Sequence, residues 1–242
     1  MLEISDLSYA YPDGHQAIDN INLDLKAGES VALVGANGAG KSSFFRLIIG
    51  IAAASSGSIK IDDLNVEKKN LKTVRERVGM VFQNPDDQLF MTKVYDDVAF
   101  GPRNQLLSES EVDEKVIAAL QQLDIMHLKD RMPHRLSGGE KRMIAIATVL
   151  CMNPELILFD EPSSFLDPKA RRKVIQTLKK LSMTKLIATH DLDMALEICD
   201  RVVILNKGKI FADGSVKEIL YDEKLLLEAN LELPLGLQRI DP

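Results

Sequence analysis

The sequence has few cysteines, no long hydrophobic run and no excess of basic residues, and each shortage excludes a class of protein. Its two cysteines, Cys151 and Cys199, lie far apart in apolar surroundings and form no C-x-x-C pair. We therefore expect buried core residues rather than a disulfide or a metal site, as in a reducing cytoplasm. The longest mostly apolar run, 143–152, is far shorter than the roughly 20 residues that span a bilayer.

The charge balance and the first ten residues exclude further classes of protein. Lys and Arg number 30 against 36 Asp and Glu, a formal net charge of −6, which argues against nucleic acid as the main partner. The first ten residues carry Glu3 and Asp6 and lack the basic-then-apolar pattern of a secretory signal. Any contact with a membrane is therefore expected to go through a partner protein.

One stretch, 31–49, combines a strand, a glycine-rich turn and a helix. Apolar residues at 31–34 predict a buried strand, and the turn after it has the spacing G-x-x-x-x-G-K-S, from Gly35 to Ser42. Such a turn directs backbone N–H groups toward an anion, and the Lys41 ammonium can reach the outer phosphates. The Ser42 hydroxyl is placed to bind Mg²⁺. A plain strand–helix turn is the alternative, but the Lys-Ser pair favours a nucleoside triphosphate site.

The first 30 residues and the loop 83–90 each leave two interpretations open. Alternating apolar residues around the turn 11–14 predict antiparallel β-structure. Tyr11 is either a strand residue beside that turn or a platform that stacks on a nucleotide base. A strand at 78–82 leads into the loop 83–90, QNPDDQLF, which is either a functional loop or a surface turn.

Residues 92–150 have helical periodicity, with an apolar stripe opposite charged residues. They predict a helical insertion between strands of an α/β core. The insertion closes with LSGGE at 136–140, and an apolar helix is expected from about residue 142 to 151. Ser-Gly-Gly before a helix forms either an anion-binding N-terminus or a simple capping turn.

Two later apolar strands end in side chains that can do chemistry. Residues 156–159 are followed by Asp160 and Glu161, and the strand 185–189 ends at His190. Open α/β sheets bind ligands at the carboxyl ends of their strands. Asp160 can therefore hold Mg²⁺, and Glu161 can activate water as a general base.

The remaining chain contains elements with clear local signals. Asp167 followed by a proline predicts the N-cap of a basic helix. Residues 201–213 predict a hairpin and a short helix follows from 215, whereas the tail after 228 has no clear period.

In order and spacing these elements resemble the nucleotide-binding subunit of ATP-binding cassette (ABC) transporters, over about residues 1–225. The most specific feature is Ser-Gly-Gly at 137–139, which other phosphate-loop NTPases lack. The resemblance implies an α/β fold: a phosphate-loop NTPase (RecA-like) core with an N-terminal antiparallel β subdomain and an inserted α-helical subdomain. It implies one ABC ATPase domain at 1–228, made of a core at 1–84 and 153–228 and a helical insertion at 85–152, and then a short C-terminal extension at 229–242.

The resemblance also implies roles for single residues. Glu161 is the expected catalytic base, Gln83 senses Mg²⁺ and the attacking water, and His190 contacts the γ-phosphate. Tyr11 stacks on adenine and Asp167 belongs to the loop that communicates across a dimer. The residues implied to bind ATP are Tyr11, Gly35, Asn37, Gly38, Ala39, Gly40, Lys41, Ser42, Ser43, Ser137, Gly138, Gly139, Glu140 and Asp167, and those implied to bind Mg²⁺ are Ser42, Gln83 and Asp160.

In that family two such subunits form a head-to-tail dimer around two ATP molecules. Ser137, Gly138 and Gly139 would therefore act on the nucleotide of the second subunit. Glu140 replaces the commoner glutamine, and Phe165 stands in a run that is usually made of small residues. Neither change removes a catalytic atom, so an active ATPase is expected, with altered packing at Phe165.

A narrower resemblance points to the energy-coupling-factor importers of vitamins and metal ions. Residues 83–90 and 97–102 resemble the ATPases of these importers, and 187–193 is most similar to the cobalt and nickel branch. The resemblance implies a position on the cytoplasmic face of the cell membrane. The implied partners are a second ABC ATPase subunit (an identical copy or a paralogue), a transmembrane coupling subunit and a substrate-capture membrane subunit.

A groove between the loop 83–90 and the helical insertion is the expected docking site for the membrane partner. In this family the partner inserts helices that bear arginines, so Asp86, Asp87 and Asp97 are candidate acceptors and Phe90 is a candidate anchor. The alternative for each carboxylate is ordinary solvated charge.

Two other functions compete with a cobalt or nickel importer. The ATPase of a vitamin importer would share every motif above, because another subunit chooses the cargo. A soluble cassette ATPase acting on ribosomes or DNA usually carries two cassettes or long coiled-coil insertions, and this sequence has neither. A small-molecule kinase leaves the Ser-Gly-Gly at 137–139 unexplained.

Overall fold

The computed structural model describes residues 1–238, and the chain divides into two compact units. The first unit joins Met1–Arg75 to Met183–Pro242, and the second is Glu76–Ser182. Helix α2 (Leu71–Arg77) contains the point at which the chain leaves the first unit.

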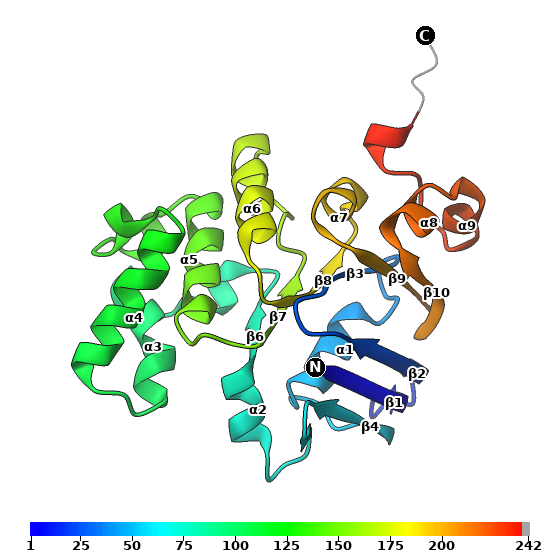
Figure 1. Ribbon diagram of the computed structural model, residues 1–242, viewed down its shortest axis with the longest axis horizontal. Coiled ribbons are helices and arrows are strands. Elements are labelled where there is room, and N and C mark those ends of the chain that lie inside the picture. Colours follow the sequence, from blue (N-terminus) through cyan, green and yellow to red (C-terminus); the bar gives the residue numbers. More distant parts are fainter. Residues whose placement is uncertain (239–242) are drawn as a thin grey trace. The chain divides into compact units, whose positions relative to one another are not determined.

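The first unit opens with an antiparallel sheet in the order β2-β1-β4-β5. Figure 1 shows its three long strands in blue and teal, with β1 in the middle. Buried Leu2, Ile4 and Leu7 of β1 face the interior, as the alternation in the sequence predicts. The strands are β1 (Leu2–Ala10), β2 (Gln16–Leu25), β4 (Ser56–Ile61) and β5 (Leu64–Asn65).

A second set of strands in the same unit carries the phosphate loop. Their order is β10-β9-β3-β8, with β3 parallel to both of its neighbours and β9 and β10 forming the predicted hairpin. All five residues of β3 are buried, in keeping with a continuous apolar strand. The strands are β3 (Ser30–Val34), β8 (Thr184–Thr189), β9 (Arg201–Asn206) and β10 (Lys209–Ser215), and helix α1 (Lys41–Ile48) follows β3.

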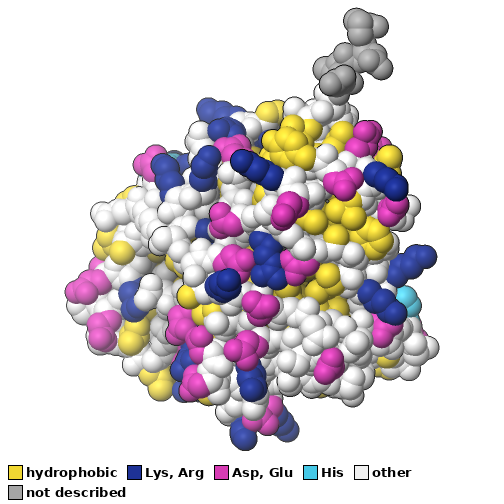
Figure 2. All heavy atoms as spheres, turned by 45° about the vertical axis from the view of Figure 1, so that its right-hand side comes forward, with side chains coloured by type: hydrophobic (Ala, Val, Ile, Leu, Met, Phe, Trp, Pro, Cys, Tyr) yellow, Lys and Arg dark blue, Asp and Glu magenta, His cyan; other side chains and the backbone are white. Residues whose placement is uncertain are grey.

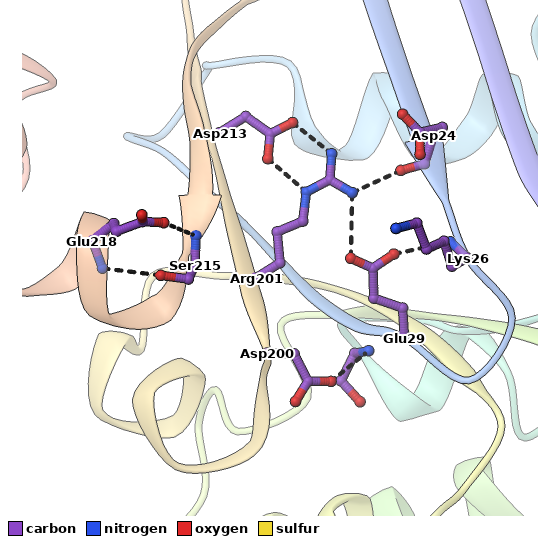
Figure 3. A network of polar contacts seen from close by, with 9 residues as sticks. Asp24, Lys26, Glu29, Asp200, Arg201, Asp213, Ser215 and Glu218 are labelled. Carbon is purple, nitrogen blue, oxygen red and sulfur yellow. Dashed lines mark hydrogen bonds and ion pairs between the residues drawn. The ribbon is translucent and has the colours of Figure 1, made fainter.

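Arg201 joins three segments of the first unit (Figure 3). Its guanidinium donates two hydrogen bonds of 2.6 Å to the Asp213 carboxylate on β10. It also donates to the Asp24 carbonyl at 2.9 Å and to the Glu29 carboxylate at 3.3 Å. These bonds raise the pKa of Arg201, so one permanently charged side chain fastens the hairpin to the turn between β2 and β3.

The second unit contains one parallel pair of strands and a group of helices. Strand β6 (Val78–Val81) pairs with β7 (Leu156–Asp160), and the chain between them forms the helices of the predicted insertion. In α4, buried Val112, Val116 and Leu120 form the predicted apolar stripe. The helices are 3₁₀-helix η1 (Pro85–Asp87), α3 (Val94–Asn104), α4 (Glu109–Gln122), η2 (Met126–Leu128), η3 (Pro133–Arg135), α5 (Gly138–Leu150) and, after β7, α6 (Pro168–Lys180).

The C-terminal part of the first unit consists of short helices around a hydrophobic cluster that also includes Val34 and Ala32 of β3. Figure 2 shows hydrophobic side chains grouped on one face of the molecule. Tyr221, Leu227 and Leu235 of this C-terminal part are exposed. Of the predicted extension 229–242, the last four residues lie outside the described part. The helices are α7 (Leu192–Ile198), α8 (Val216–Leu220), α9 (Glu223–Glu228) and η4 (Leu235–Leu237).

Both cysteines are free thiols. Cys151 is buried, as predicted, whereas Cys199 is only partly buried at the edge of the hydrophobic cluster. Burial raises the pKa of each to about 12. Among residues 1–238, no helix is long and apolar enough to cross a bilayer.

Candidate nucleotide site

The phosphate loop is a tight turn whose shape depends on Gly40, the N-cap of α1. Gly40 has φ of 110°, in the left-handed region, and a Cβ at this position would lie 2.6 Å from the Ala17 carbonyl oxygen. Only glycine fits both constraints. No side chain caps the helix, and the N-terminus of a helix favours an anion.

The Lys41 side chain, at the end of the phosphate loop, reaches back to the residues that begin the loop. Its ammonium donates hydrogen bonds to the carbonyl of Gly35 at 2.6 Å and to that of Ala36 at 3.4 Å. The side chain is buried, whereas Ser42 is exposed at the first turn of α1. Asn37 and Gly38 are also exposed, and Ala39 is buried. The loop therefore has a defined shape and a polar outer side, as a phosphate cradle requires.

Tyr11 lies against this loop rather than out in the turn. A 2.7 Å hydrogen bond joins its hydroxyl to the Ser43 hydroxyl of α1. Its ring is stacked with the ring of His15 at a centroid distance of 6.3 Å and contacts the ring of Tyr9 edge-on at 5.1 Å. The structure thus brings an aromatic group beside the phosphate loop, where a nucleotide base can stack on it.

His190 follows the strand next to the phosphate loop. Thr189, the last residue of β8, pairs with Val34, the last residue of β3. Gly35 and His190 therefore leave neighbouring parallel strands at the same level. His190 is exposed, so it is accessible from the carboxyl ends of these strands.

Gln83 follows β6 in the second unit, and a residue that the sequence analysis did not single out positions it. Arg142 is the largest fully buried side chain, and its guanidinium donates hydrogen bonds to the carbonyls of Phe82 and Gln83. Burial lowers the pKa of Arg142 to about 10, while the charge of nearby Asp160 opposes the shift. An arginine within an otherwise apolar helix is the signal that could have identified it, because a buried cation requires acceptors.

Asp160 and Glu161 lie where β7 ends, beside the strand that leads to Gln83. Val81 of β6 pairs with Phe159 of β7, so the two strands end together. Both carboxylates are 6% exposed. Glu161 has φ of 47°, which is unusual for a residue with a side chain. The Ser164 hydroxyl donates to its Oε2 at 3.3 Å.

The Ser-Gly-Gly segment opens α5, and this helix begins at Gly138 rather than near residue 142 as predicted. The cause is a capping box. Ser137 accepts from the N–H of Glu140, and the Glu140 carboxylate accepts from the Ser137 N–H at 2.9 Å and from its hydroxyl at 2.7 Å. These bonds lower the pKa of Glu140. The two glycines are thus helical residues, and the predicted capping turn is present. The anion-binding role of this segment stays a prediction.

A pocket of about 340 Å³ in the second unit gathers four of the predicted site residues. Asp167 caps α6 through the N–H groups of Lys169 and Ala170, as predicted. The predicted site residues in its wall are Ser137, Gly139, Glu140 and Asp167, and Lys169, Lys173 and His127 add basic groups.

Phe165 lies in the loop between Glu161 and Asp167. Its side chain is 92% exposed and its φ is 63°, so an apolar ring is held in solvent by a strained backbone. A large exposed aromatic in this position is typical of a residue that a partner covers.

Residues 18–164 match the family described as ABC transporter. The chain belongs to the ABC transporter family. An ABC transporter ATP-binding protein binds ATP and hydrolyses it to power transport, so this protein is an ATPase. The match covers the phosphate loop, the Gln83 loop, the Ser-Gly-Gly segment and the carboxylate strand.

Relatives of this ABC transporter ATPase cover nearly its whole length. A putative ABC transporter ATP-binding protein of Geobacter sulfurreducens is 48% identical over 98% of the chain and 96% of its own length. The energy-coupling factor transporter ATP-binding protein EcfA of Methanothermobacter thermautotrophicus is 44% identical over 97% of the chain and 77% of its own length. The predicted similarity to energy-coupling-factor ATPases is confirmed.

Solved structures confirm the fold class. The structure of cbiO1 from Clostridium perfringens, part of the ABC transporter complex cbiONQ, has a TM-score of 0.84 and 40% identity, covering 96% of this chain and 95% of that one. A dimeric post-hydrolysis state of the cassette MJ0796, bound to ADP and phosphate, has a TM-score of 0.80 and 27% identity over 89% of this chain and 99% of that one.

Proposed function

We propose that this ATPase powers an energy-coupling-factor type importer at the cytoplasmic face of a membrane, with cobalt or nickel ions as the cargo. The likeness to EcfA and to cbiO1 supports the importer class. The resemblance of residues 187–193 to the cobalt and nickel branch is the support for metal ions as the cargo. The observation that carries the proposal is a buried, incompletely paired Asp97 bonded to the backbone of Phe90, whose exposed ring contacts that of Phe100. This combination fits a cationic helix of a membrane partner.

In this proposal Glu161 removes a proton from the water that attacks the γ-phosphate. Its burial and its hydrogen bond from Ser164 hold the carboxylate in one orientation, which a general base needs. Gln83 orients the same water, and Arg142 fixes the backbone at Gln83. His190 contacts the γ-phosphate from the end of β8, while Lys41 neutralises charge on the outer phosphates.

The residues expected to hold Mg²⁺ fit that ion. Within the described chain no group of three His, Cys, Asp or Glu side chains could hold a metal by itself. Ser42, Gln83 and Asp160 offer one hydroxyl, one amide and one carboxylate oxygen, and Mg²⁺ typically takes few protein ligands together with phosphate and water. When bound, the ion would balance charge that develops on the phosphates.

The proposed working form is a head-to-tail dimer with an identical or paralogous ATPase. The pocket lined by Ser137, Gly139 and Asp167 also carries Lys169, Lys173 and His127, basic groups that suit the γ-phosphate of the partner's ATP, while the Ser137 hydroxyl is bonded to Glu140. The exposed Phe165 would be covered in such a dimer. The dimeric structure of the cassette MJ0796 supports a dimer as the working form.

The proposed docking surface for the transmembrane subunit is formed by the loop 83–90 and helix α3. Asp97 is 3% exposed, and its Oδ1 accepts from the N–H groups of Phe90 and Met91 at 2.9 and 3.0 Å. Its Oδ2 is buried without a hydrogen-bond partner among residues 1–238. Beside it the exposed rings of Phe90 and Phe100 meet edge-on at 5.0 Å. An arginine flanked by apolar residues would complete this site.

The other two candidate carboxylates have partners within the chain. Asp86 receives a 2.6 Å hydrogen bond from the Lys141 ammonium, and Asp87 receives one of 3.3 Å from the Asn84 amide. Asp97 is therefore the acceptor that we favour for the partner's arginine, with Phe90 as the apolar anchor.

The test is to isolate the tagged protein from detergent-solubilised membranes of its host and identify the proteins that accompany it. A multi-spanning subunit with a small cargo-binding membrane protein is the expected result. Loss of radiolabelled cobalt or nickel uptake in a deletion strain would identify these ions as the cargo. Loss of vitamin uptake instead would show that the protein powers a vitamin importer. If the tagged protein is recovered with ribosomes or DNA and without a membrane protein, the proposed importer function is wrong. The assignment as an ATPase would still hold.

A further inference from the structure

The segment 231–238, here called the tail strap, is tied to the first turn of α7. Both carboxylate oxygens of Asp193 accept backbone hydrogen bonds from it, from the N–H of Leu235 at 3.0 Å and from that of Gly236 at 2.8 Å. These N–H groups belong to η4, whose own N-cap residue, Pro234, supplies no side-chain cap. Asp193 therefore caps η4 from a helix some forty residues earlier, through charge-assisted bonds.

The tail strap is also packed against the core beneath α7. Leu231 and Leu233 contact the hydrophobic cluster that includes Leu192 and Ala195 of α7. At Gly236 a Cβ would lie 3.1 Å from Asp193 Oδ1, so the backbone approaches the carboxylate more closely than a larger residue comfortably allows. The strap and α7 form a fitted pair, held by apolar contact and by two hydrogen bonds.

Only one residue, Asp191, separates His190 from helix α7. The Asp191 carboxylate caps α7 at the N–H of Met194, and the Asp191 N–H donates to the Thr189 hydroxyl, both at 3.0 Å. Thr189 is fully buried in β8. His190 thus lies between a fixed strand end and the first turn of α7. A helix of seven residues has little stability by itself, so its position depends on what packs against it.

We propose that Asp193 is a positioning residue and that the tail strap, acting through it, sets the place of His190 at the γ-phosphate. This inference rests on the proposed role of His190. Release of the strap frees the first turn of α7 and moves His190 without touching the phosphate loop. Catalysis should then fall while ATP binding is retained, because displacements of about 1 Å reduce catalysis strongly.

The experiment compares three forms of the full chain with the parent: Asp193→Ala, deletion of residues 231–242, and the control Asp222→Ala. Asp222 makes the same kind of cap but on α9 rather than on η4, through the Leu225 N–H at 3.0 Å. Asp193→Ala and the deletion should each lower kcat about tenfold with KM for ATP within about twofold. Hydrogen exchange of the amides at 190–195 should accelerate in both, and Asp222→Ala should change neither quantity.

A folded Asp193→Ala protein with parental kcat, or with parental exchange at 190–195, would overturn the proposal. A rise in KM matching the loss of kcat would indicate general damage and would also count against it. If the deletion variant fails to fold, the kcat and hydrogen exchange of Asp193→Ala still test the proposal. His190→Ala is measured alongside: parental hydrolysis by that variant removes His190 from the mechanism, whereas the exchange result still reports on the strap.

Discussion

The hydroxyl groups of Tyr11 and Ser43 are 2.7 Å apart, so the turn between the first two strands is bonded to the helix of the phosphate loop. This bond gives the Tyr11 ring a fixed position before any nucleotide arrives. The ring and the hydroxyl can be separated by substitution, and the two have different expected roles.

Tyr11→Phe should bind ATP within about twofold of the parent, whereas Tyr11→Ala should bind about fivefold to tenfold more weakly. Phe retains the aromatic surface, and aromatic contacts of this kind contribute about 0.5–1.5 kcal/mol. Titration with a fluorescent ATP analogue measures both affinities. Equal losses in the two variants would show that the hydroxyl bond, and not the ring, matters for binding.

Glu161→Gln should reduce ATP turnover by roughly two orders of magnitude and leave a stable ATP-bound dimer. Gln has the same shape but cannot accept the proton of the attacking water. Steady-state hydrolysis and gel filtration with ATP measure the two effects. Ser164→Ala is the matched control, because it removes the hydroxyl that bonds to Glu161 and keeps the base; its activity should fall less. Near-normal turnover by Glu161→Gln would rule out this base.

Asp97→Asn should stabilise the free chain at neutral pH and weaken assembly with the membrane subunit. Burial raises the pKa of Asp97 above its ordinary 3.8, so the parent loses stability as the pH rises through that raised pKa. Asn retains an oxygen for the Phe90 and Met91 amides. Urea unfolding between pH 4 and pH 8 should therefore show the advantage of the variant growing with pH.

Two results would contradict this account of Asp97. A constant difference in unfolding free energy across the pH range would show that Asp97 does not titrate as its burial requires. Unchanged recovery of the membrane subunit with Asp97→Asn would remove Asp97 from the docking surface.

Arg201→Ala should lower the free energy of unfolding by about 2–3 kcal/mol, because it leaves Asp213 and Glu29 without their charged donor. Arg201→Lys should lose less, since an ammonium retains the charge but not the two-pronged geometry. Lys209→Ala is the control: its exposed ion pair with Asp19, at 3.0 Å, should contribute less than about 1 kcal/mol. Urea unfolding measures all three, and equal losses in Arg201→Ala and Lys209→Ala would contradict the network in Figure 3.

The sequence predicted the features that depend on neighbouring residues. The phosphate loop, the apolar strands before Asp160 and His190, and the Asp167 cap are each contained within a few positions, so spacing reveals them. The start of α5 was missed, because the Ser137–Glu140 capping box extends the helix over two glycines that favour turns.

Residues whose task depends on distant partners could not be found in this way. Arg142 acts on carbonyls some 60 positions earlier and Asp193 on amides more than 40 positions later. Only the folded chain places these groups together. Asp97 was already a candidate from the sequence, but only the folded chain separates it from Asp86 and Asp87, because its second oxygen is buried without a partner among residues 1–238.

The inert thiols of Cys151 and Cys199 make this chain convenient for spectroscopy. With both pKa values near 12, almost none of either thiol is the reactive thiolate at neutral pH. The sequence also contains no tryptophan. A single cysteine or tryptophan introduced at Phe165 would therefore report on its surroundings against a silent background, and subunit closure could be followed in real time without altering any native residue elsewhere.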